Sequence, residues 1–315
     1  MREIGGYIEY EYSRGKMLHD DAVFLNCGRR ALSYLIKSRD IKKIWIPKFT
    51  CGSVIEPFEK ESVDVRFYSI GTGFRPEIDN IPGGEWLVLI NYYGQISNEQ
   101  IIEIRNQHPK LIVDNTQAYY QMPVPDVDTV YTCRKFFGVA DGAVLYTNST
   151  LKEEFKKDES FKRMTYIMGR FERTASEFYE MYDRNNSLFD HEPIKQMSKL
   201  THNILCGIDF DFVCKTRTVN FRYLDEKLRD INRLKLSVPD GAFMYPLYID
   251  NGTNIRKQLI AKHIYIPTLW PDVFTFCDEK DLECDMARNI LPLPVDQRYG
   301  IEDMEYIVSN VMEGI

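Results

Sequence analysis

The sequence predicts an α/β protein whose largest part is a mostly parallel sheet covered by helices on both faces. Short apolar runs alternate with segments of helical spacing over the first half of the chain, which is the order expected of parallel strands joined by helical crossovers. Polar residues stand at the ends of several runs, where ligands bind in such sheets. We therefore expect a three-layer α/β/α large domain over residues 1–210 and a smaller α+β C-terminal domain over residues 211–315.

Five apolar runs in the first half have the length and composition of buried strands. They lie at 43–47, 63–68, 85–90, 111–114 and 129–131. Apolar residues at helical spacing, or a polar run between strands, predict helices at 31–36, 54–60 and 98–107.

The second half has a different character, because residues 151–190 are rich in charged and aromatic side chains. Amphipathic helices are predicted there at 151–157 and 171–182, with a loop at 183–187. A long helix is expected from about residue 201, resuming at 212 and continuing through 224. Further strands are predicted at 241–248, 264–267 and 290–295, and further helices at 254–262 and 301–308. Prolines in the 290–295 run indicate an edge strand.

Composition narrows the possible functions. The chain has 315 residues, of which 44% are hydrophobic and 28% charged, as in ordinary globular proteins. A net charge of −7 argues against a nucleic-acid partner. No apolar run is long enough to span a membrane. Seven scattered cysteines form no CxxC pair and do not cluster with the five histidines, so we expect no metal site, no disulfide framework and a cytoplasmic location.

One lysine stands among aromatic residues after the run that ends at residue 131. Lys135 precedes Phe136 and Phe137. Partial desolvation by such neighbours lowers the pKa of a lysine and frees its amine for carbonyl chemistry. The alternative is a surface lysine whose stem packs on the aromatic rings.

Two other positions have the chemistry of binding residues. Asp114 ends an apolar run, and is either a buried, partnered carboxylate or the N-cap of the next turn. Asn26 and Gly28 stand where a helix should begin. Free N–H groups and the positive end of the helix dipole favour an anion there, above all a phosphate. A plain helix cap is the alternative.

Three motifs occur in an informative order. They are Val113-Asp114-Asn115-Thr116-Gln117-Ala118, then Lys135 followed by Asp141-Gly142, then Leu291-Pro292-Leu293-Pro294 ahead of 301–307. Together they resemble the pyridoxal-phosphate-dependent sugar aminotransferases of the DegT/DnrJ/StrS type, which have the aspartate aminotransferase (type I) fold. The resemblance runs from about residue 20 to residue 310 and rests on order, spacing and the alternation of strands and helices.

The resemblance implies roles for three residues around the cofactor ring. Lys135 corresponds to the lysine that binds pyridoxal 5'-phosphate covalently and moves a proton between substrate and cofactor. Asp114 corresponds to the acid that pairs with the pyridine nitrogen, which keeps the ring protonated and able to accept electrons. Gln117 corresponds to the residue that contacts the ring hydroxyl.

The resemblance also implies a phosphate site and a substrate contact. Gly28 and Arg29 correspond to the pair whose backbone binds phosphate at a helix start, and Thr132 to a phosphate-binding serine upstream of the lysine. Tyr92 lies in a turn similar to one near the family's site, and is the candidate substrate contact. The residues at 217, 220 and 223 resemble an Arg-x-x-Asn-x-x-Tyr helix, which we interpret as structural.

Some positions depart from the family pattern. Cys51 lies where many members have the aromatic residue that stacks on the cofactor ring. The segment 194–198 lacks the asparagine that contacts phosphate across the dimer, and Asp141-Gly142-Ala143 replaces Gly-Glu-Gly-Gly, with Ala140 at its first glycine.

The resemblance implies a cytoplasmic homodimeric enzyme. It would transfer an amino group from an amino-acid donor, commonly glutamate, to a keto-sugar on a nucleotide carrier, in the synthesis of surface polysaccharides or amino sugars. Sugar dehydration on the same scaffold is a different reaction, but dehydrating relatives have histidine where this chain has Lys135. The alternative function is a non-catalytic or differently acting protein that binds a sugar nucleotide or a partner without transamination.

Overall fold

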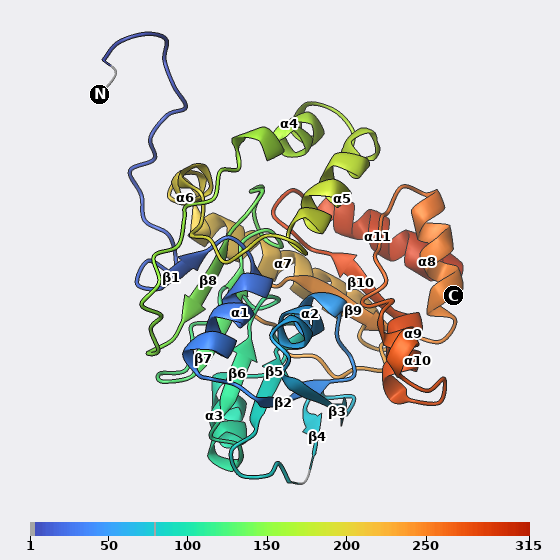
Figure 1. Cartoon of the computed structure of the whole chain (residues 1–315). Coiled ribbons are helices and arrows are strands. Elements are labelled where there is room, and N and C mark those ends of the chain that lie inside the picture. Colours follow the sequence, from blue (N-terminus) through green and yellow to red (C-terminus); the bar gives the residue numbers. More distant parts are fainter. Residues whose placement is uncertain (1–3, 79) are drawn as a thin grey trace.

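The computed structural model describes residues 4–78 and 80–315, and a large twisted sheet lies at its centre (Figure 1). Over these residues the sheet has eight strands in the order β1-β8-β7-β6-β5-β2-β3-β4. They are β1 (Val23–Leu25), β2 (Lys43–Pro47), β3 (Asp64–Ile70), β4 (Pro76–Glu77), β5 (Trp86–Ile90), β6 (Leu111–Asp114), β7 (Asp128–Thr132) and β8 (Ala143–Tyr146). All five predicted apolar runs of the first half are strands of this sheet, so the predicted fold class is confirmed.

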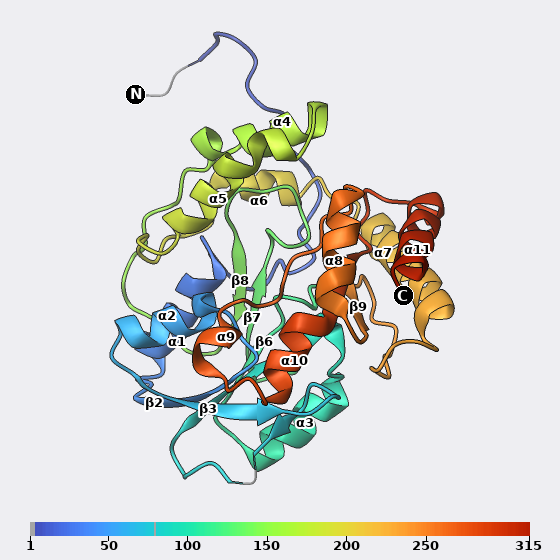
Figure 2. The same cartoon turned by 90° about the vertical axis from the view of Figure 1, so that its right-hand side faces the viewer.

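The direction of the chain reverses in the middle of the sheet. β2, β3, β5, β6 and β7 are parallel. From β2 the chain crosses through α2 (Gly52–Lys60) to β3, and from β5 it crosses in the opposite direction through α3 (Asn98–Gln107) to β6. Right-handed crossovers in opposite directions place α2 and α3 on opposite faces of the sheet, as Figure 2 shows. The strand order therefore reverses between β2 and β5, and ligands bind at such a point.

α1 (Gly28–Ser38) packs beside α2 on one face of the sheet. It buries Ala31, Leu32 and Leu35, as the helical spacing predicted. Burial of one leucine side chain contributes about 1.5–3 kcal/mol, which fixes the helix against the sheet. The N-cap residue, Cys27, makes no side-chain capping bond, so no side-chain acceptor caps the start of α1 from this position.

The last third of the chain is built around a two-stranded antiparallel sheet of β9 (Met244–Tyr248) and β10 (Ile290–Pro294). Its helices are α7 (Phe210–Leu228), α8 (Gly252–Ala261), α9 (Val273–Phe276), α10 (Leu282–Asn289) and α11 (Ile301–Gly314). Buried side chains from α7, β9, β10 and α11 form a hydrophobic cluster separate from the core of the large sheet. The smaller α+β part is thus present, while the domain boundary at residues 210 and 211 stays a prediction.

Short helices connect the two parts. They are η2 (Phe161–Arg163), α4 (Thr165–Glu172), η3 (Ser176–Phe178), α5 (Tyr179–Leu188) and α6 (Lys199–Leu205), and another short turn, η1 (Tyr92–Gly94), follows β5. The predicted helix at 171–182 is wrong in its bounds, because the chain leaves helical structure at Arg173. The predicted loop at 183–187 is also wrong, since these residues lie in α5. There Asn185 donates a hydrogen bond to the carbonyl of Ala140 at 2.9 Å.

Two further predicted elements are absent from the described chain. Residues 151–157 form no helix, because their backbone pairs with a distant segment: the N–H of Gln196 donates to the carbonyl of Lys156 at 2.9 Å. Residues 264–267 form no strand. Ile264 and Ile266 are buried in the second cluster, which explains the strand-like alternation, but no neighbouring strand pairs with them.

In the described part of the chain, no helix is both long enough and apolar enough to cross a lipid bilayer.

Candidate active site

The predicted site residues gather at one edge of the large sheet. Asp114 is the last residue of β6, and Lys135 follows the end of β7. Cys51 follows β2, and Tyr92 follows β5. These four strands are neighbours and parallel, so their carboxyl ends meet at the same edge, beside the point where the strand order reverses.

Lys135 presents its amine at this edge. Its Nζ donates a hydrogen bond to Thr116 Oγ1 at 2.9 Å, and lies 5.6 Å from the centre of the Phe243 ring. The side chain keeps contact with solvent, yet the protein atoms around the amine desolvate it and lower the pKa of Lys135 below its ordinary value. Asp114 opposes this shift. The direction is the predicted one, but Phe136 is buried in the core, and the ring beside the amine is that of Phe243.

Asp114 is buried, with 4% of its surface exposed. Its Oδ1 accepts a hydrogen bond from the backbone N–H of Thr116 at 2.9 Å, so it caps the following turn as well as being buried. Among the described residues it has no basic partner within ion-pair distance. Burial of a carboxylate without a cation is costly, and Asp114 therefore suits a ligand that brings a positively charged N–H group.

Gln117 and Tyr92 lie deeper than Lys135. Gln117 is buried, and its Oε1 accepts a hydrogen bond from the backbone N–H of Tyr93 at 2.8 Å. Tyr92 is buried too. Its hydroxyl donates to the carbonyl of Phe49, which ties the end of β5 to the end of β2. The contacts of Gln117 with a cofactor and of Tyr92 with a substrate stay predictions.

The predicted phosphate site is at the start of α1. Gly28 is the first residue of the helix, and a Cβ atom added there would meet nothing within 4 Å. Arg29 pairs with Asp190 at 2.9 Å. Thr132 donates a hydrogen bond to the carbonyl of Gly142 at 3.4 Å, while the N–H of Gly142 donates to the carbonyl of Asn26 at 2.7 Å. Thr132 is thus linked to the segment that leads into α1.

Cys51 lies close enough to Lys135 and Asp114 for their charges to act on its thiol. It is half-buried at the N-cap of α2, and burial raises the pKa of its thiol while nearby Lys135 opposes this. Its position near Lys135 and Asp114 agrees with a place on the wall of the site, where the resemblance expects an aromatic ring. Thr50, its neighbour, is fully buried with a hydroxyl that has no partner in the described chain.

Three side chains at this edge were not predicted as site residues. Thr116 connects Lys135 to Asp114, and Phe243 comes from the start of the smaller sheet. Arg134, directly before Lys135, lies with its guanidinium 4.8 Å from the centre of the Phe189 ring. The basic character of Arg134 next to the lysine was visible in the sequence, whereas the other two contacts depend on packing between distant segments.

A network from the smaller part of the chain holds the segment that carries Lys135. Arg217 is buried in α7 and donates hydrogen bonds to the carbonyls of Phe136 at 3.2 Å and Ala242 at 2.9 Å. Gln297 donates to the same Phe136 carbonyl at 2.9 Å. The predicted structural role of the helix that contains Arg217 therefore extends to the backbone next to the lysine.

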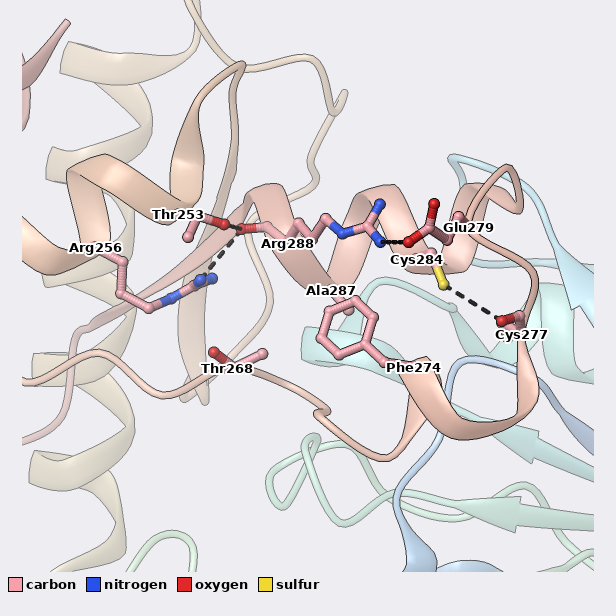
Figure 3. Close-up of a pocket in the computed structure, with 9 residues that line it drawn as sticks. All are labelled: Thr253, Arg256, Thr268, Phe274, Cys277, Glu279, Cys284, Ala287 and Arg288. Carbon is pink, nitrogen blue, oxygen red and sulfur yellow. Dashed lines mark hydrogen bonds and ion pairs between the residues drawn. The ribbon is translucent and has the colours of Figure 1, made fainter.

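A separate cavity of about 420 Å³ lies among α8, α9 and α10 (Figure 3). Arg256 donates hydrogen bonds to the carbonyls of Arg288 at 3.2 Å and Ile290 at 2.7 Å. The guanidinium of Arg288 lies 3.9 Å from Glu279. Protein oxygens thus engage both cations, and the described residues that line this cavity include none of the predicted site residues. The chemistry therefore belongs to the sheet edge around Lys135.

The charges at this edge fit pyridoxal phosphate. Asp114 is a buried carboxylate without a cation, and suits the protonated pyridine nitrogen. The start of α1 and Arg134 form a positive region that suits the phosphate. Lys135 reaches the space beside Asp114 with an amine of lowered pKa. The residues present therefore fit the two ends of the group and its aldehyde, and their individual roles stay predictions.

Comparison with known proteins reveals the same fold. No protein-family model and no curated protein matches the sequence. The structural match with a DegT DnrJ EryC1 StrS aminotransferase from Brucella abortus covers 93% of this chain and 85% of that protein, with a TM-score of 0.60 and 14% sequence identity. The match with DesV of S. venezuelae covers 93% of this chain and 84% of DesV, with a TM-score of 0.65 and 14% identity. The match with NtdA of Bacillus subtilis covers 93% of this chain and 72% of NtdA, with a TM-score of 0.66 and 10% identity.

The likeness extends over nearly the whole chain, as the resemblance in sequence motifs predicted. At identities of 10% to 14% it concerns the arrangement of the elements. The chain has the fold of the DegT/DnrJ/EryC1/StrS aminotransferases.

Proposed function

We propose that this chain is a pyridoxal-phosphate-dependent aminotransferase that moves an amino group from an amino-acid donor to a keto-sugar. The observation that carries the proposal is the set of charges at the sheet edge. A buried carboxylate without a cation, Asp114, is linked through Thr116 to a lysine amine of lowered pKa. Thr132, three residues before the lysine, is linked through Gly142 to the segment that leads into the positive start of α1. These charges are complementary to a cofactor with a basic ring nitrogen and a phosphate.

The structures with the same fold support the chemical class. The Brucella abortus protein is described as an aminotransferase of the DegT DnrJ EryC1 StrS type, and NtdA was solved with the bound cofactor PMP. A protein from Micromonospora echinospora of the same fold is described as a sugar aminotransferase, with a TM-score of 0.63 and 12% identity. These descriptions favour a cofactor with an amino-carrying form and a sugar substrate for the present chain.

Each residue at the edge has a part in this chemistry. Bound pyridoxal phosphate supplies an electron sink for the carbon that carries the amino group. Asp114 would hold the ring nitrogen of the group in its protonated form. Lys135, whose pKa is lowered, holds more neutral amine at neutral pH than an ordinary lysine does, so it can attack a carbonyl and then accept and return a proton. Thr116 fixes the position of Nζ between these events.

The experiment is an absorbance titration of the purified protein with pyridoxal phosphate, for wild type, Lys135→Ala and Lys110→Ala. We expect a visible band for wild type and for Lys110→Ala, whose amine donates a hydrogen bond to the Gly84 carbonyl, away from the candidate site. Lys135→Ala should lack the band. Borohydride reduction and mass spectrometry should find the cofactor on Lys135. A wild-type protein without the band, or a band that survives in Lys135→Ala, contradicts the proposal.

Glutamate added to the loaded protein separates an aminotransferase from a protein that only binds the cofactor. Transfer of the amino group to the cofactor bleaches the visible band, and a nucleotide-linked keto-sugar should then restore it. A panel of such sugars that differ in nucleotide identifies the carrier. A band that persists with glutamate and with other amino acids contradicts transamination and favours the alternative, a protein that binds its ligand without transferring an amino group.

The proposal includes a homodimer in the cytoplasm, with a role in amino-sugar or surface-polysaccharide synthesis. Several large apolar side chains on the connecting helices are exposed to solvent, among them Phe171 with 92% of its surface exposed and Tyr179 with 64%. Exposed apolar groups in one region are typical of an interface. All seven cysteines are free, which suits a reducing compartment. Light scattering of the purified protein tests the dimer, and a monomeric mass contradicts it.

A further inference from the structure

Arg134 links the segment of Lys135 to the first turn of α1. It directly precedes Lys135 in the chain, and its guanidinium lies against the Phe189 ring and donates a hydrogen bond to the side-chain oxygen of Asn186. The carbonyl of the same Phe189 accepts a hydrogen bond at 3.2 Å from Arg30, which lies in the first turn of α1. Arg134 is thus near the start of the helix that the proposed function assigns to the cofactor phosphate.

The neighbouring arginines all have acidic partners. Arg29 pairs with Asp190 and Arg30 with Glu56, each at 2.9 Å. Arg163, which lies over the same Phe189 ring as Arg134, pairs with Asp158 at 2.6 Å.

Arg134 differs from these arginines in its partners. Within residues 4–78 and 80–315 no carboxylate lies within ion-pair distance of its guanidinium, which donates to the neutral amide of Asn186. Its buried Nε has no acceptor there, which is also true of Arg29 and Arg30. A partly buried cation without a counter-charge costs free energy. An anion supplied by a ligand would remove that cost.

The start of α1 offers space for such an anion. Gly28 faces open space, and Cys27 provides no side-chain cap. The N–H groups of Arg30 and Ala31 donate to the carbonyl of Cys27, whereas those of Gly28 and Arg29 donate to no acceptor within the described residues. The first two N–H groups of the helix therefore remain for a ligand.

We propose that Arg134 binds the phosphate of the cofactor from the same chain that provides Lys135. This inference rests on the proposed function. It also accounts for a departure noted in the sequence, because the asparagine expected in segment 194–198 is absent, and a charged contact from Arg134 takes over part of its task. A guanidinium binds phosphate through two parallel N–H bonds and retains its charge at any working pH.

The test compares affinity for pyridoxal phosphate with affinity for pyridoxal, which lacks the phosphate. Arg134→Gln should weaken binding of pyridoxal phosphate about ten- to a hundredfold, the effect of losing charge-assisted hydrogen bonds. It should change binding of pyridoxal less than about threefold, since the ring contacts remain. Arg134→Lys, which retains the charge, should recover part of the loss. Inorganic phosphate should compete with pyridoxal phosphate in wild type and less effectively in Arg134→Gln.

Arg163→Gln is the matched control, because Arg163 stacks on the same Phe189 ring but already has a carboxylate. It should leave the ratio of the two affinities unchanged, and thermal unfolding with circular dichroism verifies that each variant is folded. Arg134→Gln with an unchanged ratio overturns the inference while the proposed function stands. A wild-type protein that binds neither pyridoxal phosphate nor pyridoxal overturns the proposed function, and the inference with it.

Discussion

The amine of Lys135 donates a hydrogen bond to the hydroxyl of Thr116 at 2.9 Å. The backbone N–H of Thr116 donates in turn to Asp114, also at 2.9 Å. One small residue therefore sets the position of the amine relative to the carboxylate. This link connects the ends of two neighbouring strands, β6 and β7, and keeps the amine beside the carboxylate that opposes its pKa shift.

Thr116→Val should leave the fold intact and weaken this link. Valine has the shape of threonine without the hydroxyl, so Nζ of Lys135 loses its acceptor while the backbone bond to Asp114 remains. One hydrogen bond contributes about 0.5–1.5 kcal/mol, and we expect covalent capture of pyridoxal phosphate to slow about two- to tenfold. Stopped-flow absorbance measures the rate. Thr116→Ser, which retains a hydroxyl, serves as the control, and equal rates in the two variants would contradict the proposed role.

Asp114→Asn should lower the pKa of Lys135 further. Desolvation lowers this pKa, and the carboxylate of Asp114 raises it because a negative charge favours the protonated amine. Removal of the charge leaves desolvation less opposed. Competitive acylation of the protein without cofactor, followed by mass spectrometry across a pH series, gives the midpoint for Lys135. Asp211→Asn, on the surface of α7, is the control. A midpoint that rises in Asp114→Asn is incompatible with this account.

The burial of His19 should make the folded protein less stable in acid. It is fully buried, and burial lowers its pKa to about 4, with its hydrogen bond to the Tyr119 carbonyl opposing. The folded state favours the neutral ring. The stability that His19 contributes is therefore complete above its ordinary pKa of 6.5 and is lost as the pH falls towards 4. The free energy of unfolding should fall by about 3 kcal/mol over that range.

Urea unfolding at several pH values, for wild type and His19→Gln, measures this contribution. The two proteins share their carboxylates, so the difference between their pH profiles isolates the imidazole. Glutamine provides an N–H donor for the Tyr119 carbonyl and a carbonyl acceptor for the Tyr146 hydroxyl, which retains both contacts of the ring. Parallel profiles for the two proteins would mean that His19 does not titrate as its burial implies.

Local patterns sufficed for the five parallel strands and for the placement of Asp114 and Lys135 at one edge of the sheet. Each parallel strand is a short apolar run, and Asp114 stands at the end of one such run in the sequence itself. Lys135 follows another strand, so the topology of a parallel sheet brings both to the same edge. These predictions depend on neighbours in the chain, which a single sequence displays.

The remaining contacts depend on pairs of segments that are far apart in the chain. Phe243 lies near the Lys135 amine because the segment before β9 packs on the segment after β7, where the Phe243 and Phe136 rings are 5.8 Å apart. The helix predicted at 151–157 is absent for the same reason, because the backbone N–H of Gln196 bonds to the carbonyl of Lys156 in that segment. Ile264 and Ile266 have the alternation of a strand but no strand to pair with. Such outcomes are decided by tertiary packing, which propensity does not record.

Cys51 should be protected from alkylation when the cofactor is bound. Its thiol is half-buried near Lys135 and Asp114, and burial raises its pKa, so alkylation will be slow and will speed up in alkaline solution. Pyridoxal phosphate held between Lys135 and Asp114 would cover it. Peptide mapping after treatment with iodoacetamide measures the extent at each cysteine. Cys214, on α7, is the internal control, and equal protection of Cys51 and Cys214 would place the cofactor elsewhere.

Arg217→Met should destabilise the protein and disturb Lys135 at the same time. The guanidinium donates to the buried carbonyls of Phe136 and Ala242. In Arg217→Met the Phe136 carbonyl keeps its bond from Gln297, whereas the Ala242 carbonyl loses its side-chain donor. Because an unsatisfied buried acceptor costs about 1–3 kcal/mol, we expect a loss of about that size in the free energy of unfolding. Gln297→Leu should cost only about 1 kcal/mol, since Arg217 still donates to Phe136.

The double variant separates a shared function from two independent losses. If Arg217 and Gln297 hold the same carbonyl jointly, the second substitution removes its last side-chain donor, and the combined loss should exceed the sum of the single losses. Denaturant unfolding gives the three free energies, and capture of pyridoxal phosphate by each folded variant reports on Lys135. If the free-energy losses are additive and capture is normal, Arg217 acts only on the stability of the fold. If the combined loss exceeds the sum and capture is slower, the smaller part of the chain also positions the lysine.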